Sequence, residues 1–291
     1  MIGQTATPRL SDEPDIADFL RKLSLELASG DVRLPSFPGI AMRVQQVLDD
    51  PKASRERIVK VIGADTALAA RILKLANSAF LRPSTKAVTD LAQVVTILGH
   101  QLVRCTAVSF SLQQMDLNNP DLKPLLRQLW LTSTLIASIA HVLAHRTRAK
   151  RSDEAMVAGL MQSIGQLFIL ANSPKSLLRH GGSESWQRAV HTFHPRIGSS
   201  ILKHWKFPAS IVTAVANQNT WDRKLGSDEY LTDLVSASTA LAPCAADRSR
   251  LSPELVSTPP FQRLSLSLED CKTLFIEAGG QIKELHAALT F

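Results

Sequence analysis

The chain has 291 residues, of which 45% are hydrophobic and 20% are charged. These proportions exclude a disordered chain, and the length suffices to bury a core without a disulfide or metal staple. Aromatic residues make up only 5%, so the core consists mainly of Leu, Ile, Val and Ala, a composition that favours helices over a β-sandwich.

The net charge is +7, from 33 Lys and Arg against 26 Asp and Glu. This balance permits contact with nucleic acid or an acidic protein without requiring it. Three widely spaced cysteines, Cys105, Cys244 and Cys271, indicate neither a disulfide framework nor a zinc ribbon. The N-terminus lacks an apolar run typical of a secretory signal, and no stretch approaches about 20 uninterrupted apolar residues. We therefore expect a cytoplasmic protein without a membrane span.

The first half of the chain shows helical periodicity interrupted by capping and breaking residues. Pro14 and Asp15 open a helix that Gly30 ends, and two prolines make residues 34–39 a rigid connector. A helix over 40–48 follows, and then two helices capped by Ser54 and Asp65. A fifth helix ends at Gly99, and a longer segment covers 101–115.

Asn118-Asn119-Pro120 is the clearest break, and the chain beyond it is again helical. Helices are predicted over 122–145, 154–171, 186–193, 195–205, 209–218 and 229–242. Ser267 and Asp270 form a capping box for the last stretch, which Gly279-Gly280 interrupts. We predict an all-α protein divided into a flexible tail (1–14), an N-terminal bundle (15–117), a second helical subdomain (121–245) and a C-terminal helical extension (246–291).

The histidines are the main candidates for chemistry, because phosphate-cradling loops and nucleophile elbows are absent from the sequence. His141 and His145 have the spacing of two metal ligands on a helix, but no Glu lies between them. We interpret them as surface imidazoles at the end of an amphipathic helix. His191 and His194 form a second pair, with few other ligands nearby.

The densest positive cluster, a candidate patch for an anionic partner, is Arg146, Arg148, Lys150 and Arg151. It could supply a few salt-sensitive phosphate contacts. Because it lacks interleaved aromatic residues and lies between two predicted helices, a solvated charged loop explains it better than a nucleic-acid site.

One segment resembles a known family. Residues 34–80 read LPSFPGIAMRVQQVLDDPKASRERIVKVIGADTALAARILKLANSAF, and residues 88–99 continue as VTDLAQVVTILG. This series of spaced motifs closely resembles the HDOD domain, an HD-related output domain of bacterial signalling proteins, and the likeness extends to about residue 225. The resemblance implies an N-terminal helical bundle followed by a degenerate subdomain related to HD and HD-GYP phosphohydrolases.

The resemblance also places the positions where HD hydrolases hold metal. The first histidine position falls at Thr132, and the His-Asp pair falls at Gln162-Ser163. His194 remains, a tandem-histidine position reads Gln218-Asn219, and the closing aspartate falls near Thr239. Neutral Thr, Gln and Ser side chains cannot offset the charge of a divalent cation.

We therefore expect no enzyme activity, no metal and no cofactor. Gly165 and the helix pattern still allow the fold. The neutral residues would instead form a vestigial pocket that bonds within itself or to a small ligand. Its candidate members are Thr132, Gln162, Ser163, His194 and Gln218.

The function implied is a stand-alone, non-catalytic regulatory module in a bacterial signalling pathway, acting through protein partners or by sensing a small ligand such as a nucleotide. The expected docking site is the groove between the bundle and the HD-like half. Two alternatives remain: a metal-dependent phosphohydrolase with altered ligands, and a nucleic-acid-binding regulator. The partner, the oligomeric state and the process controlled stay open.

Overall fold

The computed structural model describes residues 13–29, 39–78, 81, 87–114, 122–147, 152–178, 183–222 and 230–290, and these contain helices but no strand. The all-α prediction is confirmed. The helices are α1 (Glu13–Ser29), α2 (Gly39–Asp49), α3 (Arg55–Gly63), α4 (Thr66–Ala76), α5 (Leu91–Gln114), α6 (Leu122–Arg146), α7 (Ser152–Met161), α8 (Ile164–Asn172), α9 (Lys175–Leu178), α10 (Glu184–His204), α11 (Ala209–Asn217), α12 (Tyr230–Ala246), the 3₁₀ turn η1 (Arg248–Arg250), α13 (Pro253–Val256), α14 (Pro259–Arg263), α15 (Leu268–Glu277) and α16 (Gly279–Leu289).

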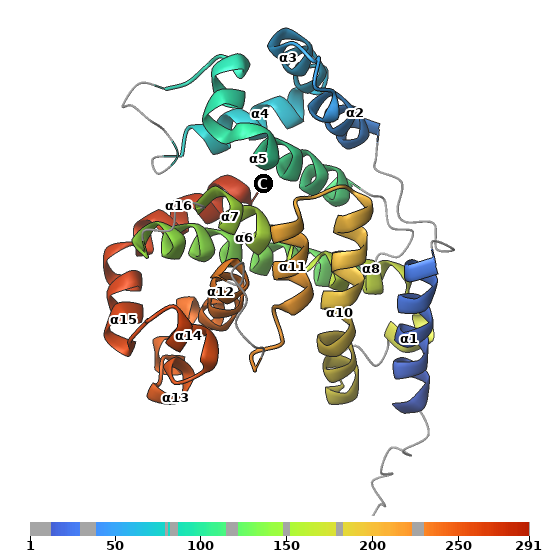
Figure 1. The fold of residues 1–291 in the computed structure, drawn as a ribbon, viewed down its shortest axis with the longest axis vertical. Coiled ribbons are helices and arrows are strands. Elements are labelled where there is room, and N and C mark those ends of the chain that lie inside the picture. The colour runs from blue at the N-terminus through green and yellow to red at the C-terminus, as the bar shows by residue number, and fades with distance from the viewer. Residues whose placement is uncertain are drawn as a thin grey trace, which may run out of the picture.

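Helices α2–α5 form one layer, drawn above α6, α7 and α16 in Figure 1. The predicted caps are present, because Ser54 accepts a hydrogen bond from the Arg57 amide and Asp65 accepts one from the Leu68 amide. The expected interruption at Gly99 is a kink within α5, where this residue has a φ of 68°. Glycine adopts that left-handed conformation without the strain that a Cβ would introduce.

Asn77 joins α4 to the segment before α5. Its Nδ2 donates to the carbonyls of Leu73 (2.9 Å) and Val88 (2.7 Å), and its Oδ1 accepts from the Val88 amide at 2.7 Å. One side chain thus pairs with both backbone groups of Val88, as a neighbouring strand would. This contact gives the asparagine of the LANSAF motif a structural role.

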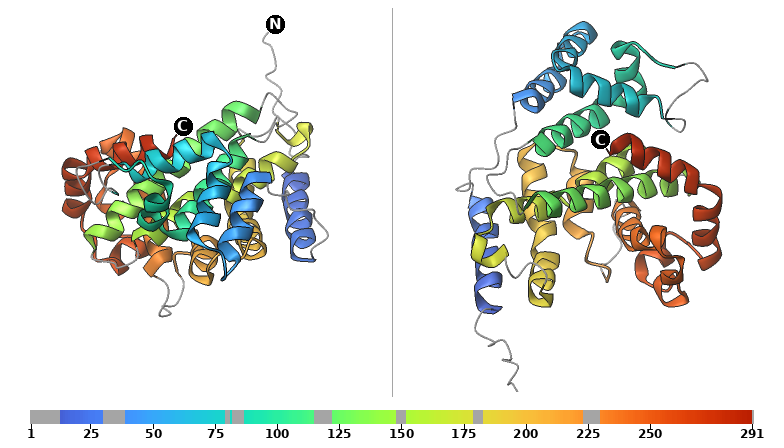
Figure 2. Two further views of the ribbon diagram at one scale, coloured as in Figure 1. Left: turned by 90° about the horizontal axis from the view of Figure 1, so that it is seen from above. Right: turned by 180° about the vertical axis from the view of Figure 1, so that it is seen from behind.

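Helix α1 lies against α10 in the second half of the chain rather than beside α2–α5 (Figures 1 and 2). The predicted bundle over 15–117 therefore includes a helix whose apolar face is covered elsewhere. Ile16, Leu20 and Leu23 supply that buried face. Their spacing predicts a buried stripe but does not specify which helix covers it.

Two junction hydrogen bonds connect the α2–α5 layer to the end of α10. Gln45 Nε2 donates to the Trp205 carbonyl at 3.0 Å, and Arg104 Nη1 donates to the Lys206 carbonyl at 3.4 Å. Arg104 is buried and also forms an ion pair with Asp49. Polar contacts as well as apolar packing therefore hold the two halves together.

Helices α7 and α8 correct the prediction of one helix over 154–171. The chain turns at Gln162–Ser163, between the two helices. The turn lets α8 approach α10 closely: a Cβ on Gly165 would lie 2.0 Å from the His194 carbonyl oxygen. The glycine thus permits backbone-to-backbone packing that no other residue allows.

Helix α10 corrects the second boundary, because it runs through Pro195, where two helices were predicted. Proline has no amide hydrogen, so it leaves the carbonyl four residues earlier, that of His191, without its helical donor. Asn219 Nδ2 donates to this carbonyl at 2.7 Å. A side chain from beyond α11 therefore supplies the missing hydrogen bond.

The C-terminal extension packs against both halves. The predicted Ser267–Asp270 capping box is confirmed, and α16 begins at the predicted glycine pair. Helix α16 lies on α6 and α4, and His286 Nε2 donates to the Leu131 carbonyl at 3.1 Å. Arg263, at the end of α14, forms a bidentate ion pair with buried Asp233 of α12, with distances of 2.7 and 2.8 Å.

Two segments of the described residues are long and apolar enough to span a membrane, Leu91–Ser111 and Ser152–Asn172. Their most apolar windows are 56% and 72% buried within the protein. This burial is typical of core helices.

Candidate functional site

The turn at Gln162–Ser163 lies in the protein core, where α6, α10 and the end of α11 meet α7 and α8. Four of the predicted pocket residues are almost fully buried: Gln162 is 4% exposed, Ser163 6%, His194 2% and Gln218 2%. Sequence positions more than 50 residues apart thus share one cluster. These four residues and Ser133 are called the polar centre below.

Ser133 is the member that the sequence analysis missed. Its hydroxyl is hydrogen-bonded to that of Ser163 and donates to the Leu129 carbonyl at 2.8 Å. Half-buried Thr132 instead donates to the Gln128 carbonyl on its own helix. The predicted Thr132 position is therefore displaced by one residue. The helical phase offered a signal, because Ser133 shares its face with Ile136, Ala137 and Ala140.

Gln218 links the centre to its neighbours. Its Nε2 donates to the carbonyls of Gln162 at 2.9 Å and Val215 at 3.1 Å. Its backbone carbonyl accepts from the Ser236 hydroxyl at 2.7 Å. Its buried Oε1 has no hydrogen-bond partner among the described residues. The amide therefore acts mainly as a donor that ties α11 to the turn.

His194 is held in its neutral form. Burial and the nearby imidazole of His191 lower its pKa to about 3. Asn219 Nδ2 donates to His194 Nε2 at 3.2 Å, which assigns the ring proton to Nδ1. Because the imidazolium form is absent at neutral pH, His194 cannot serve as a general acid there, and its basic nitrogen already accepts a hydrogen bond.

Thr239, the position that resembles the last aspartate of the HD hydrolase pattern, also carries a hydroxyl. Thr239 donates back to the Val235 carbonyl of its own helix at 2.9 Å. One turn earlier, Ser236 reaches Gln218. Helix α12 thus contributes a second uncharged donor around the polar centre.

This donor set does not fit a divalent metal ion. Within the described ranges, no three His, Cys, Asp or Glu side chains lie close enough to hold one. The Ser133 and Ser163 hydroxyls bond to each other and the Gln218 amide donates to backbone carbonyls, so these groups bring no negative charge. No residue of the centre can therefore balance a buried dication.

The histidine pair on α6 differs from the prediction. His141 is buried, and its Nδ1–H donates to the Ser152 carbonyl at the start of α7, 3.0 Å away. Burial lowers the pKa of this imidazole. His145 is exposed, as expected. The interpretation as two surface imidazoles was therefore wrong for His141, which fastens α7 to α6.

The basic patch is only partly described. Arg146 ends α6 and forms an ion pair with Glu277 of α15 at 2.8 Å. Arg148, Lys150 and Arg151 lie outside the described residues. The described part of the patch thus contacts the C-terminal extension.

Comparison with known proteins defines the class. The sequence model of the HDOD domain matches residues 34–221. The all-helical fold of the described residues agrees with this match. The chain belongs to the HDOD domain family.

Solved structures show the same fold. An HDOD domain protein of unknown function from Geobacter sulfurreducens is 22% identical, with a TM-score of 0.65 over 94% of this chain and 97% of the other. A protein provisionally named a metal-dependent phosphohydrolase, from Shewanella amazonensis, is also 22% identical, with a TM-score of 0.67 over 95% and 99%. No curated protein matches the chain.

Proposed function

We propose that this protein is a non-catalytic output module of bacterial signal transduction, located in the cytoplasm, which acts through contacts with other proteins. The observation that carries this proposal is the polar centre, in which Gln162, Ser163 and Gln218 occupy positions that resemble the metal-ligand positions of HD hydrolases. Membership of the HDOD family supports the signalling role.

The loss of charge removes the basis for hydrolysis. A metal-dependent phosphohydrolase lowers the pKa of a bound water from about 15.7 to about 7. The polar centre offers neither carboxylates to hold such a metal nor a base to orient the water. With its pKa near 3, His194 is neutral at pH 7 and could in principle accept a proton from water. Its Nε2, however, already accepts a hydrogen bond from Asn219 and is not available for this role.

The burial of the centre limits what can reach it. Its five residues are between 1% and 6% exposed, so they do not line an open groove as expected from the sequence. A nucleotide that contacted them would first have to separate α7 and α8 from α10. We therefore assign signalling to the outer surfaces of the two halves, with the polar centre as an internal link between helices.

The test has two arms on the purified full chain. Elemental analysis and a phosphoester hydrolysis assay, each with added divalent metal, are expected to give no stoichiometric metal and no chelator-sensitive turnover. A stoichiometric metal with chelator-sensitive hydrolysis would establish the phosphohydrolase alternative instead.

The second arm is a pull-down from a bacterial lysate, with and without cyclic dinucleotides. We expect a protein partner that survives nuclease treatment. A change on adding the nucleotide would add a ligand to the proposal. Binding that is lost with nuclease, and that weakens steeply with salt, would favour the nucleic-acid alternative.

A further inference from the structure

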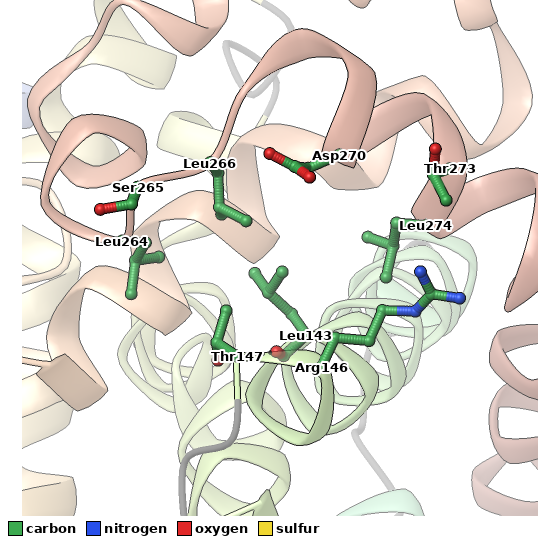
Figure 3. A pocket seen from close by; sticks show the side chains of 9 residues that line it. All are labelled: Leu143, Arg146, Thr147, Leu264, Ser265, Leu266, Asp270, Thr273 and Leu274. Atoms are coloured by element: carbon green, nitrogen blue, oxygen red, sulfur yellow. Dashed lines mark hydrogen bonds between the residues drawn. The ribbon is translucent and has the colours of Figure 1, made fainter.

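A cavity of about 440 Å³ lies between the last turn of α6 and the turn that joins α14 to α15 (Figure 3). Four leucines form its apolar lining: Leu143, Leu264, Leu266 and Leu274. Only Leu143 lies within residues 34–221, the part that matches the HDOD family. The cavity is therefore built largely by the C-terminal extension and is separate from the polar centre.

The two charged residues of the lining differ in direction. Figure 3 shows the Asp270 carboxylate pointing over Leu143 into the cavity, whereas the Arg146 guanidinium extends past Leu274. Arg146 Nη2 already contacts Glu277 Oε2 at 2.8 Å. The charge of Arg146 is therefore neutralised by Glu277, which is not part of the lining. The carboxylate of Asp270 is the charged group that remains for a ligand.

The two carboxylate oxygens of Asp270 differ in their hydrogen bonds. Ser267 donates to its Oδ2 twice, from the amide at 2.8 Å and from the hydroxyl at 2.5 Å. None of the hydrogen bonds among the described residues ends on Oδ1. The lining holds one cation, Arg146, which is paired with Glu277, and one anion, Asp270.

We propose that this cavity binds an aliphatic primary amine, with the alkyl chain against the four leucines and the ammonium group donating to Asp270 Oδ1. The leucines remove the alkyl chain from water, as apolar surfaces do for the stem of a lysine side chain. A carboxylate at the same place would meet the like charge of Asp270. The proposal does not depend on the function assigned above.

The test is a titration of the full chain with n-butylamine, n-pentylamine and n-hexylamine, followed by NMR of leucine methyl groups. We expect saturable shifts at the four leucines and an affinity that rises about fourfold with each added methylene. 1-Pentanol and pentanoate are the matched probes, and both should bind more weakly than n-pentylamine.

Asp270→Asn tests the proposed contact, because asparagine keeps one acceptor for the Ser267 amide while its NH2 group replaces the charged Oδ1 acceptor. We expect its affinity for n-pentylamine to fall by about fivefold, the size of an exposed ion pair. Glu56→Gln, the same change of charge on the exposed surface of α3, should leave binding unchanged. Equal binding of 1-pentanol, equal binding by Asp270→Asn, or no saturation up to the solubility limit of the amines would overturn the proposal.

Discussion

Two buried polar regions in the second half of the chain handle charge in opposite ways. The polar centre contains only uncharged groups, which are hydroxyls, amides and a neutral imidazole. One element away, α12 and α14 are joined by the charged pair Asp233–Arg263, whose side chains are 2% and 15% exposed. The comparison teaches that the one buried carboxylate among the described residues, that of Asp233, lies where a cation with matching geometry faces it.

The largest expected effect comes from breaking the charged pair. Asp233→Asn leaves the Arg263 guanidinium without its counter-charge, and we expect the free energy of unfolding to fall by about 3–5 kcal/mol. Urea denaturation followed by circular dichroism measures the loss. The double variant Asp233→Leu with Arg263→Met is the control and should recover most of it. A loss below about 1 kcal/mol for Asp233→Asn would mean that the pair behaves as a surface ion pair.

The second prediction adds a charge to the polar centre, where no residue of opposite charge can pair with it. Ser163→Asp adds a carboxylate to the polar centre without a cation, and we expect a loss of about 3 kcal/mol at pH 7. Burial raises the folded-state pKa of such a group, so the loss should shrink as the pH falls through that raised pKa and should be smallest at about pH 4, the unfolded value. Denaturation at pH 7 and pH 4 tests this.

The control for that experiment is Ser163→Ala, which also removes the hydrogen bond to Ser133 but adds no charge. We expect it to cost about 1 kcal/mol, with little dependence on pH. If Ser163→Asp were as stable as Ser163→Ala at pH 7, the centre would tolerate charge and the contrast with Asp233 would fail.

A smaller effect follows from the neutral histidine. The pKa of His194 is about 3 in the folded protein, against about 6.5 when unfolded. As the pH falls, the unfolded chain therefore binds a proton at this histidine before the folded protein does. The stability that the neutral imidazole contributes is complete above pH 6.5 and is lost as the pH falls towards 3. Between pH 6.5 and 5 we expect a loss of about 2 kcal/mol. A His194→Gln variant should show a flatter pH profile, and an identical profile would contradict the assignment.

The smallest effect concerns the support of α10 around Pro195. Asn219→Ala removes the donor to the His191 carbonyl, and we expect a loss of about 1 kcal/mol because solvent partly replaces it. Asn219→Asp has nearly the same shape but cannot donate from that side chain, so it should lose at least as much. If Asn219→Asp kept full stability, packing rather than the hydrogen bond would hold this helix.

Local patterns predicted much of the fold. The caps at Ser54, Asp65 and Ser267 and the break at Gly99 were all confirmed, since each rests on contacts within one turn of helix. Helix continuity through Pro195 was not predicted, because the compensating donor, Asn219, lies 28 residues from the carbonyl that it serves. The turn at Gln162–Ser163 was missed for a similar reason, since the approach of α8 to α10 depends on Gly165 and His194 together.

In the candidate site, too, the sequence predicted some features and missed those that depend on contacts between helices. The family motifs identified four of the five buried members of the polar centre, but assigned the α6 position to Thr132 instead of Ser133. A shift of one residue turns a helical side chain by about 100°, which moves it from the core to the boundary. The burial of His141 was likewise hidden, because its partner is a backbone carbonyl of the next helix.

The amino-acid sequence by itself determined the helical class, most helix ends and the absence of charge at the positions that resemble a metal site. These properties depend on residue type and on neighbours along the chain. Only the tertiary structure decided that α1 packs on α10, that the polar centre is closed to solvent, and that Arg263 neutralises Asp233. Each of these depends on which apolar face covers which, and many pairings of amphipathic helices satisfy one pattern of hydrophobic spacing.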